Sequence, residues 1–150
     1  MPDPYVLAHT GAQLDDSVNR PIPITGGGTG QTARYNTITV TNDTTTVSDH
    51  NIAARYFPYL RMCFIRARVK FDNAAVEANT WVPIGSVPAD YSPVYTTALT
   101  VSLQGTAGVM KPAQAHIKND GIIEVGAADA LLASSDYYAY ISGWWLLATT

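Results

Sequence analysis

The sequence has 150 residues, of which 47% are apolar and 14% are charged, and its formal net charge is −3. This length suits one compact domain with a short appendage, and the scarcity of charge disfavours long solvated helices. The mild negative charge argues against a dedicated nucleic-acid-binding protein, which would carry a basic surplus. No apolar run approaches the roughly 20 residues of a transmembrane helix, and the N-terminus lacks the pattern of a secretory signal.

The first expected element is a short N-terminal helix. Thr10 and Gln13 have the spacing of a capping box, and Pro21 ends the helix. Its apolar residues Leu14 and Val18 lie four apart and form one narrow stripe. A helix of about ten residues is marginal alone, so the stripe needs a partner, either the chain's own domain or copies of the same helix. A two-residue stripe fits a helical seam better than a globular face, so we expect Leu14 and Val18 to mediate oligomerisation.

The glycine-rich run GGGTG at residues 26–30 raises the question of a phosphate-binding loop. A Walker loop needs a Lys near its end and a following helix. Here Gln31 takes the place of that Lys, and the chain continues toward a strand. A dinucleotide-binding fingerprint needs a buried strand before the glycines, and the preceding RPIPIT is not one. We therefore interpret residues 1–34 as a helix followed by a Gly/Pro-rich joint that binds no nucleotide.

Residues 35–51 are expected to form a short β linker, because Thr alternates with apolar residues over Asn36–Thr41. Residues 52–150 hold nearly all the bulky side chains and are expected to form the head domain.

The head domain carries several strand signals. The strongest is CFIRARVKF, Cys63–Phe71, in which apolar and mostly basic residues alternate. Cys63 is the single cysteine, so no intrachain disulfide can form. TWVPIGSVP, ALTVSLQG and DYYAYISGWWLLA are expected to be strands, the last with a bulge at Gly143. AQAHIKNDGIIEVG is expected to be a hairpin with its turn at Asn119–Gly121. Together these signals predict an all-β fold, an antiparallel β-sandwich or barrel.

The order of these motifs resembles the appendage proteins of tailed bacteriophages, such as tail fibres and baseplate receptor-binding proteins. The matching runs are HTGAQLDDSV, GGTGQTA, TWVPIGSVPADYSPVY, HIKNDGIIEV and YYAYISGWWL. They cover about residues 8–35 and 55–150. The sequence departs from the family pattern at Val87, where Leu is usual, and the chain is too short to include a long shaft.

The resemblance implies a homotrimer, with three N-terminal helices on one axis and jelly-roll-like β-sandwich heads at the tip. Each head would bind a host cell-surface saccharide. The resemblance also implies a place in the virion, in the tail or another appendage, after synthesis in the host cytoplasm. The N-terminal region would attach to other tail or baseplate proteins. No cofactor, nucleic acid or membrane insertion is implied.

Saccharide binding requires flat aromatic faces with polar groups beside them, and the sequence has nine Tyr and three Trp. The candidates that lie in or next to predicted loops and turns are Trp81, Tyr91, Tyr95, His116 and Asp120. Each has a structural alternative. A Trp in a strand more often packs in a core or a subunit contact, and Asp120 suits a turn.

Other conspicuous side chains are interpreted as structural. The aromatic residues assigned to packing are Tyr137, Tyr138, Trp144 and Trp145. The basic strip of Arg66, Arg68 and Lys70 favours a solvated or subunit-contacting role over a ligand site. No two histidines have helical metal-ligand spacing, so no metal site is expected; a histidine on the trimer axis is the alternative.

Two other functional classes would use the same features. One is a structural virion fibre or decoration protein without a ligand. The other is a glycan-degrading tail enzyme, which would need two carboxylates about 5–9.5 Å apart, and twelve acidic residues allow such a pair. The sequence has no G-x-S-x-G elbow, and Cys63 lies in mid-strand, a poor place for a nucleophile. We expect no enzymatic activity.

Overall fold

The computed structural model of the chain describes residues 35–105, 108–132 and 136–147. The expected N-terminal helix, its Leu14 and Val18 stripe and the glycine joint lie outside the described residues.

The described residues form a ten-stranded antiparallel sheet that folds over into two layers. The strands are β1 (Asn36–Ile38), β2 (Thr41–Asn42), β3 (Val47–Phe57), β4 (Met62–Phe71), β5 (Trp81–Ser86), β6 (Thr97–Gln104), β7 (Met110–Lys111), β8 (Ala113–Ile117), β9 (Ile122–Ala127) and β10 (Tyr137–Leu146). The strand order is β1-β3-β4-β10-β6-β8-β9-β5-β2, and β7 pairs with β6. A turn of 3-10 helix, η2 (Ala89–Tyr91), lies between β5 and β6. The expected all-β sandwich is confirmed.

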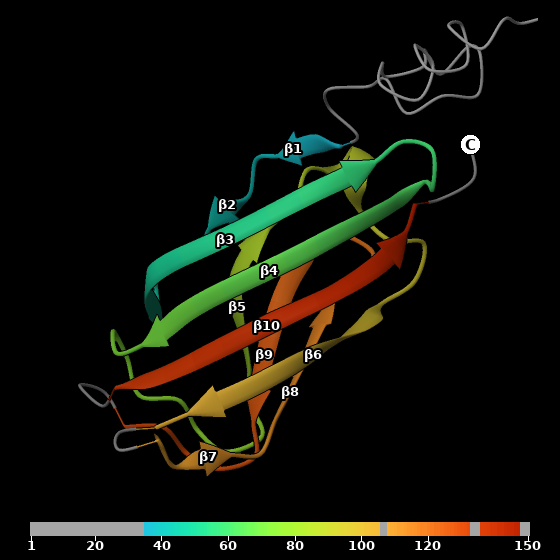
Figure 1. The fold of residues 1–150 in the computed structure, drawn as a ribbon. Coiled ribbons are helices and arrows are strands. Elements are labelled where there is room, and N and C mark those ends of the chain that lie inside the picture. The colour runs from blue at the N-terminus through green and yellow to red at the C-terminus, as the bar shows by residue number, and fades with distance from the viewer. Residues whose placement is uncertain (1–34, 106–107, 133–135, 148–150) are drawn as a thin grey trace, which may run out of the picture. The chain divides into compact units, whose positions relative to one another are not determined.

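The two layers share β6. Its residues from Thr100 to Gln104 pair with β10, whereas its residues from Thr97 to Leu99 pair with β8. The layer of β1, β3, β4, β10, β7 and β6 is called the front sheet, and the layer of β6, β8, β9, β5 and β2 is called the back sheet. Figure 1 shows the long strands β3, β4 and β10 in front of β5, β8 and β9. A strand that changes sheets makes a corner between them, as in many sandwiches.

The core lies between the two sheets and follows strand alternation. On β4 the apolar side of the alternating run is buried, as expected: Cys63, Ile65, Ala67, Val69 and Phe71. β10 pairs with β4 in register along its whole length. Residues directly opposite each other share a face, so Ile141 of β10 lies beside Ala67 in the same core. The back sheet covers this layer with Val82, Ile84, Ala115, Ile117, Ile123 and Val125.

The structure corrects the expected bulge at Gly143. This glycine pairs with Ile65 in a regular ladder. A Cβ atom at Gly143 would lie 2.5 Å from Cδ2 of Leu99, so the glycine makes room for the Leu99 side chain to pack. A bulge does occur in β5, where the pairing with β9 shifts between Pro83 and Gly85.

The segment 35–51, expected as a linker, contributes strands to the head itself. β1 pairs with β3, and β2 pairs with β5. β3 begins at Val47 and continues to Phe57, across the expected boundary between residues 51 and 52. Ile38 and Val47 are both buried in the core. Residues 35–150 fall into one compact unit, because apolar residues on both sides of that boundary enter the same core.

The thiol of Cys63 is fully buried, and this burial raises its pKa from 9.0 to about 12. Because the thiolate is the reactive form, we expect a disulfide reagent such as DTNB to leave the native protein unmodified for hours near neutral pH. In guanidinium chloride the same reagent should modify one thiol per chain. Rapid stoichiometric labelling of the native protein would contradict the placement of Cys63 in the core.

Candidate functional site

Trp81 forms an aromatic shelf on the outer face of the back sheet. It is the first residue of β5, and 40% of it is exposed. It pairs with Gly126 on β9. A Cβ atom at Gly126 would lie 3.1 Å from Cε3 of Trp81. The absence of a side chain at Gly126 therefore allows the indole to pack directly on the sheet. One face of the ring is thus supported from below.

His116 and Glu124 extend this shelf with polar groups. The two residues are directly opposite each other in the β8–β9 hairpin, and His116 Nε2 lies 2.8 Å from Glu124 Oε2. The ring centroids of His116 and Trp81 are 4.0 Å apart. Lys118 Nζ lies 3.8 Å from the other oxygen of Glu124. The side chains of His116 and Glu124 are each only 17% exposed, so this network fixes the orientation of the imidazole beside the indole.

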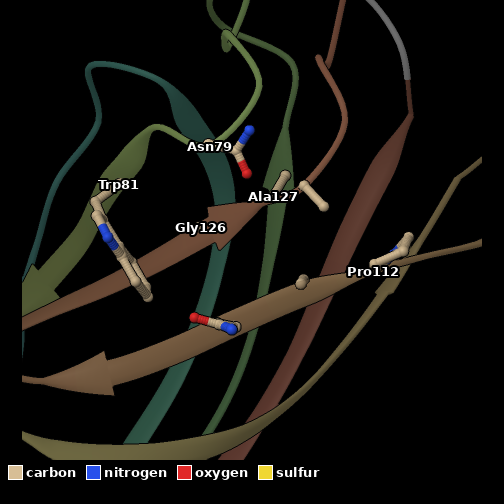
Figure 2. Close-up of a pocket in the computed structure, with 8 residues that line it drawn as sticks. Asn79, Trp81, Pro112, Gly126 and Ala127 are labelled. Atoms are coloured by element: carbon tan, nitrogen blue, oxygen red, sulfur yellow. The ribbon is translucent and has the colours of Figure 1, made fainter.

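Two hollows adjoin the Trp81 ring. The first has a volume of about 290 Å³, and its lining includes Asn79, Pro112 and Gln114. Figure 2 shows Trp81 and Asn79 on either side of Gly126, with Pro112 at the far end. The second hollow, of about 540 Å³, lies over β6 and β8, and its lining includes Thr96, Gln114 and His116. The shelf therefore combines an exposed aromatic face with amide, hydroxyl and imidazole groups.

The structure brings together two of the five sequence-predicted site residues, Trp81 and His116. Asp120 lies in the turn after β8, where its Oδ1 accepts a hydrogen bond from the backbone N–H of Ile122 at 3.0 Å. Asp120 is joined to the shelf only indirectly, through Lys118, whose Nζ lies 3.6 Å from Asp120 Oδ2. Its main interaction is the turn hydrogen bond that its position in the NDG sequence suggests.

Tyr91 and Tyr95 line neither of these hollows. Tyr91 is half-buried, its ring centroid lies 5.6 Å from that of Tyr56, and its carbonyl accepts a hydrogen bond from Trp145 Nε1 at 2.7 Å. These contacts give Tyr91 a role in packing. Tyr95 is 79% exposed and borders a separate hollow of about 480 Å³, together with Trp144.

The outer face of the front sheet is a second surface, whose aromatic and basic side chains were interpreted from the sequence as structural. Trp144 and Trp145 are adjacent in β10, so they point to opposite faces. Trp145 is 2% exposed and packs in the core, as expected. Trp144 is 46% exposed and lies on the outer face, where its ring centroid is 4.6 Å from that of Phe64 and 5.4 Å from that of Phe57. Strand alternation in YYAYISGWWL is the signal that would have separated the two.

Within residues 35–105, 108–132 and 136–147, no group of three or more His, Cys, Asp or Glu side chains is placed to hold a metal ion. The same residues include no helix long and apolar enough to cross a membrane. The chain matches no protein-family model and no curated protein.

Proposed function

We propose that the protein is a trimeric virion appendage of a tailed bacteriophage, whose β-sandwich head binds a saccharide of the host cell surface. The order of the sequence motifs supports the appendage role. The observation that carries the binding role is the half-exposed indole of Trp81, seated on Gly126 and flanked by His116. Sugar C–H groups stack on such a face, and the amides of Asn79 and Gln114 are suited to pair with sugar hydroxyls.

An open shelf of this kind covers only one side of a sugar ring. We therefore expect weak binding at each site, with a dissociation constant around millimolar, which is about 4 kcal/mol of binding free energy. Three heads in one rigid assembly would act together on a repeating glycan and gain avidity. Isolated sugars are thus poor probes, and a multivalent glycan surface is the appropriate ligand.

Replacing Trp81 with alanine should reduce binding to a glycan array, and competition with phage adsorption, at least tenfold, because the stacking surface is lost. Gly126→Ala tests the same surface without removing the ring, since the new methyl group would lie 3.1 Å from the indole and require it to shift by a few tenths of an ångström; its loss of binding should therefore be smaller than that of Trp81→Ala. Tyr95→Ala is the matched control, because Tyr95 is an exposed aromatic residue that lines neither of the hollows beside Trp81.

Thermal melting of each variant separates loss of binding from loss of folding. If Trp81→Ala melts like the parent protein and competes for adsorption equally well, the shelf is not the site. If the wild-type protein binds no glycan on the array and does not compete for adsorption, a structural virion part without a ligand is the better assignment.

A further inference from the structure

The outer face of the front sheet contains a groove of about 1030 Å³ that crosses β3, β4, β10 and β6. Strand register shows how it is built. Ala53 pairs with Arg66, Arg66 with Ser142, and Ser142 with Thr100. Residues directly opposite each other share a face of the sheet, so these four side chains form one row across it. Apart from Arg66 the row is made of small side chains, and it forms the floor of the groove.

The rows on either side of this floor are bulkier and form its walls. On one side Arg55 of β3 pairs with Phe64 of β4. On the other side Arg68 of β4 pairs with Tyr140 of β10. All four of these side chains line the groove, so the floor is bordered by aromatic rings and guanidinium groups on both sides.

The three guanidinium groups of the groove differ in their partners. Arg68 forms an ion pair with Asp49, with 2.6 Å between Nη2 and Oδ2. Arg55 lies over the ring of Tyr35, 4.3 Å from its centroid. Arg66 makes no hydrogen bond, ion pair or ring contact with any residue in the part of the chain that the structure describes. No carboxylate of the described residues lines the groove.

Lys70, the third member of the basic strip, is neutralised by two carboxylates. Its Nζ lies 2.8 Å from Asp136 Oδ1 and 2.9 Å from Asp72 Oδ2. The strip is therefore not a uniform band of positive charge. Arg68 and Lys70 are both paired with carboxylates, and Arg55 contacts a ring, whereas Arg66 lines the groove with neither kind of partner among the described residues.

We propose that this groove binds a linear acidic polysaccharide, with Arg66 as the principal contact to its carboxylate groups. A guanidinium group donates two parallel hydrogen bonds to a carboxylate, which is a short-range and strongly directional interaction. The hydroxyl groups of Thr100, Ser102 and Ser142 line the same groove and can both donate to and accept from sugar hydroxyls. The site lies on the sheet opposite the Trp81 shelf and does not depend on it.

The charge of the groove fits an acidic glycan better than a nucleic acid. Duplex DNA carries one negative charge about every 1.7 Å and is held by many cationic side chains. Among the described residues, this groove offers two guanidinium groups without a carboxylate partner, those of Arg55 and Arg66, in a chain whose net charge is −3. A polymer with one carboxylate per sugar, whose uncharged hydroxyls meet the Ser and Thr side chains, matches that sparse pattern.

The test uses the full chain and polygalacturonate as the acidic polysaccharide, with calorimetric titration at low and at near-physiological salt. We expect saturable binding that weakens as salt rises. Arg66→Gln should weaken it about tenfold or more, because a charge-assisted bidentate pair is lost. Arg66→Lys keeps the positive charge but cannot donate two parallel hydrogen bonds. Its affinity should fall between those of the wild type and Arg66→Gln. Arg61→Gln removes the same charge in the turn between β3 and β4, outside the groove, and should stay within about twofold of the wild type.

Three results would overturn the proposal. The first is equal binding by Arg66→Gln and wild-type protein, or an equal loss in Arg66→Gln and Arg61→Gln. The second is binding of a single-stranded oligonucleotide as tight as that of polygalacturonate, since it would show unselective attraction of polyanions. The third is absence of polygalacturonate binding together with a change of oligomeric state in Arg66→Gln, measured by sedimentation, which would assign this face to contacts between copies of the chain.

Discussion

Replacing Trp145 with alanine should lower the free energy of unfolding by about 3–5 kcal/mol, the usual cost of truncating a large buried aromatic residue. The side chain is 2% exposed and lies opposite Cys63 in the β4–β10 ladder. Its Nε1 donates a hydrogen bond to the carbonyl of Tyr91 at 2.7 Å, which connects the front sheet to the segment after β5. The substitution therefore leaves both a cavity and an acceptor without its partner. Denaturant unfolding followed by circular dichroism measures the loss.

Trp144→Ala is the matched control for this experiment, because it removes the same side chain one residue away. Trp144 is 46% exposed and contacts Phe57 and Phe64 on the outer face, so its loss should cost about 1–2 kcal/mol. Trp145→Phe retains most of the volume and isolates the hydrogen bond to Tyr91. If Trp144→Ala and Trp145→Ala were equally destabilising, the assignment of the two faces of β10 would be wrong.

Gly121→Ala should destabilise the protein by about 3 kcal/mol and lower its melting temperature by roughly 10–20 °C. Gly121 has φ of +88°, a conformation that costs a residue with a Cβ atom about 1–2 kcal/mol. The added Cβ would also lie 2.6 Å from the carbonyl oxygen of Val87 and 2.8 Å from Ser92 Oγ. The carbonyl of Gly121 accepts a hydrogen bond from the N–H of Val87 at 3.0 Å, so a shift that relieves the clash would strain this contact.

Gly108→Ala provides the comparison that separates the cost of the positive φ from the cost of the steric clash. Gly108 also has a positive φ, of +77°, but nothing lies within 4 Å of its added Cβ. Its substitution should cost only the backbone strain of the positive φ, about 1–2 kcal/mol. Equal melting temperatures for Gly108→Ala and Gly121→Ala would show that the turn after β8 does not approach Val87 as closely as described. Calorimetric melting of both variants beside the wild type makes this comparison.

The parts of the fold that could be predicted are those with a local signal. The nine-residue alternation of Cys63–Phe71 requires only one buried face, and β4 follows it. Asn119–Gly121 set a tight turn between β8 and β9 because glycine accepts a positive φ there. β3 was not predicted as one strand, because its pairing with β4 shifts between Ser48 and Asn51 and the alternation of its sequence is interrupted at that point.

The candidate site could be predicted only in part, because it depends on pairing between distant strands. Trp81 and His116 lie side by side because both pair with residues of β9. Trp81 pairs with Gly126, and His116 pairs with Glu124. The hairpin turn makes the second pairing predictable. The first depends on the register of β5, which shifts at a bulge between Pro83 and Gly85. Pro and Gly inside a strand are a local signal for such a bulge, but they do not give the register that results. The basic strip that contains Arg66 was recognised and interpreted as solvated or subunit-contacting; the groove around it could not be predicted, since its floor comes from four strands.

The position of β10 has a consequence for folding during synthesis. This strand, residues 137–146, lies between β4 and β6 in the front sheet. All of β10, through residue 146, must therefore emerge from the ribosome before the front sheet can close. Until then β4 and β6 each present an unpaired edge flanked by apolar residues, the kind of surface that templates aggregation. Nascent chains arrested before β10 should depend on chaperones, and closure of the sandwich should be a late, long-range step.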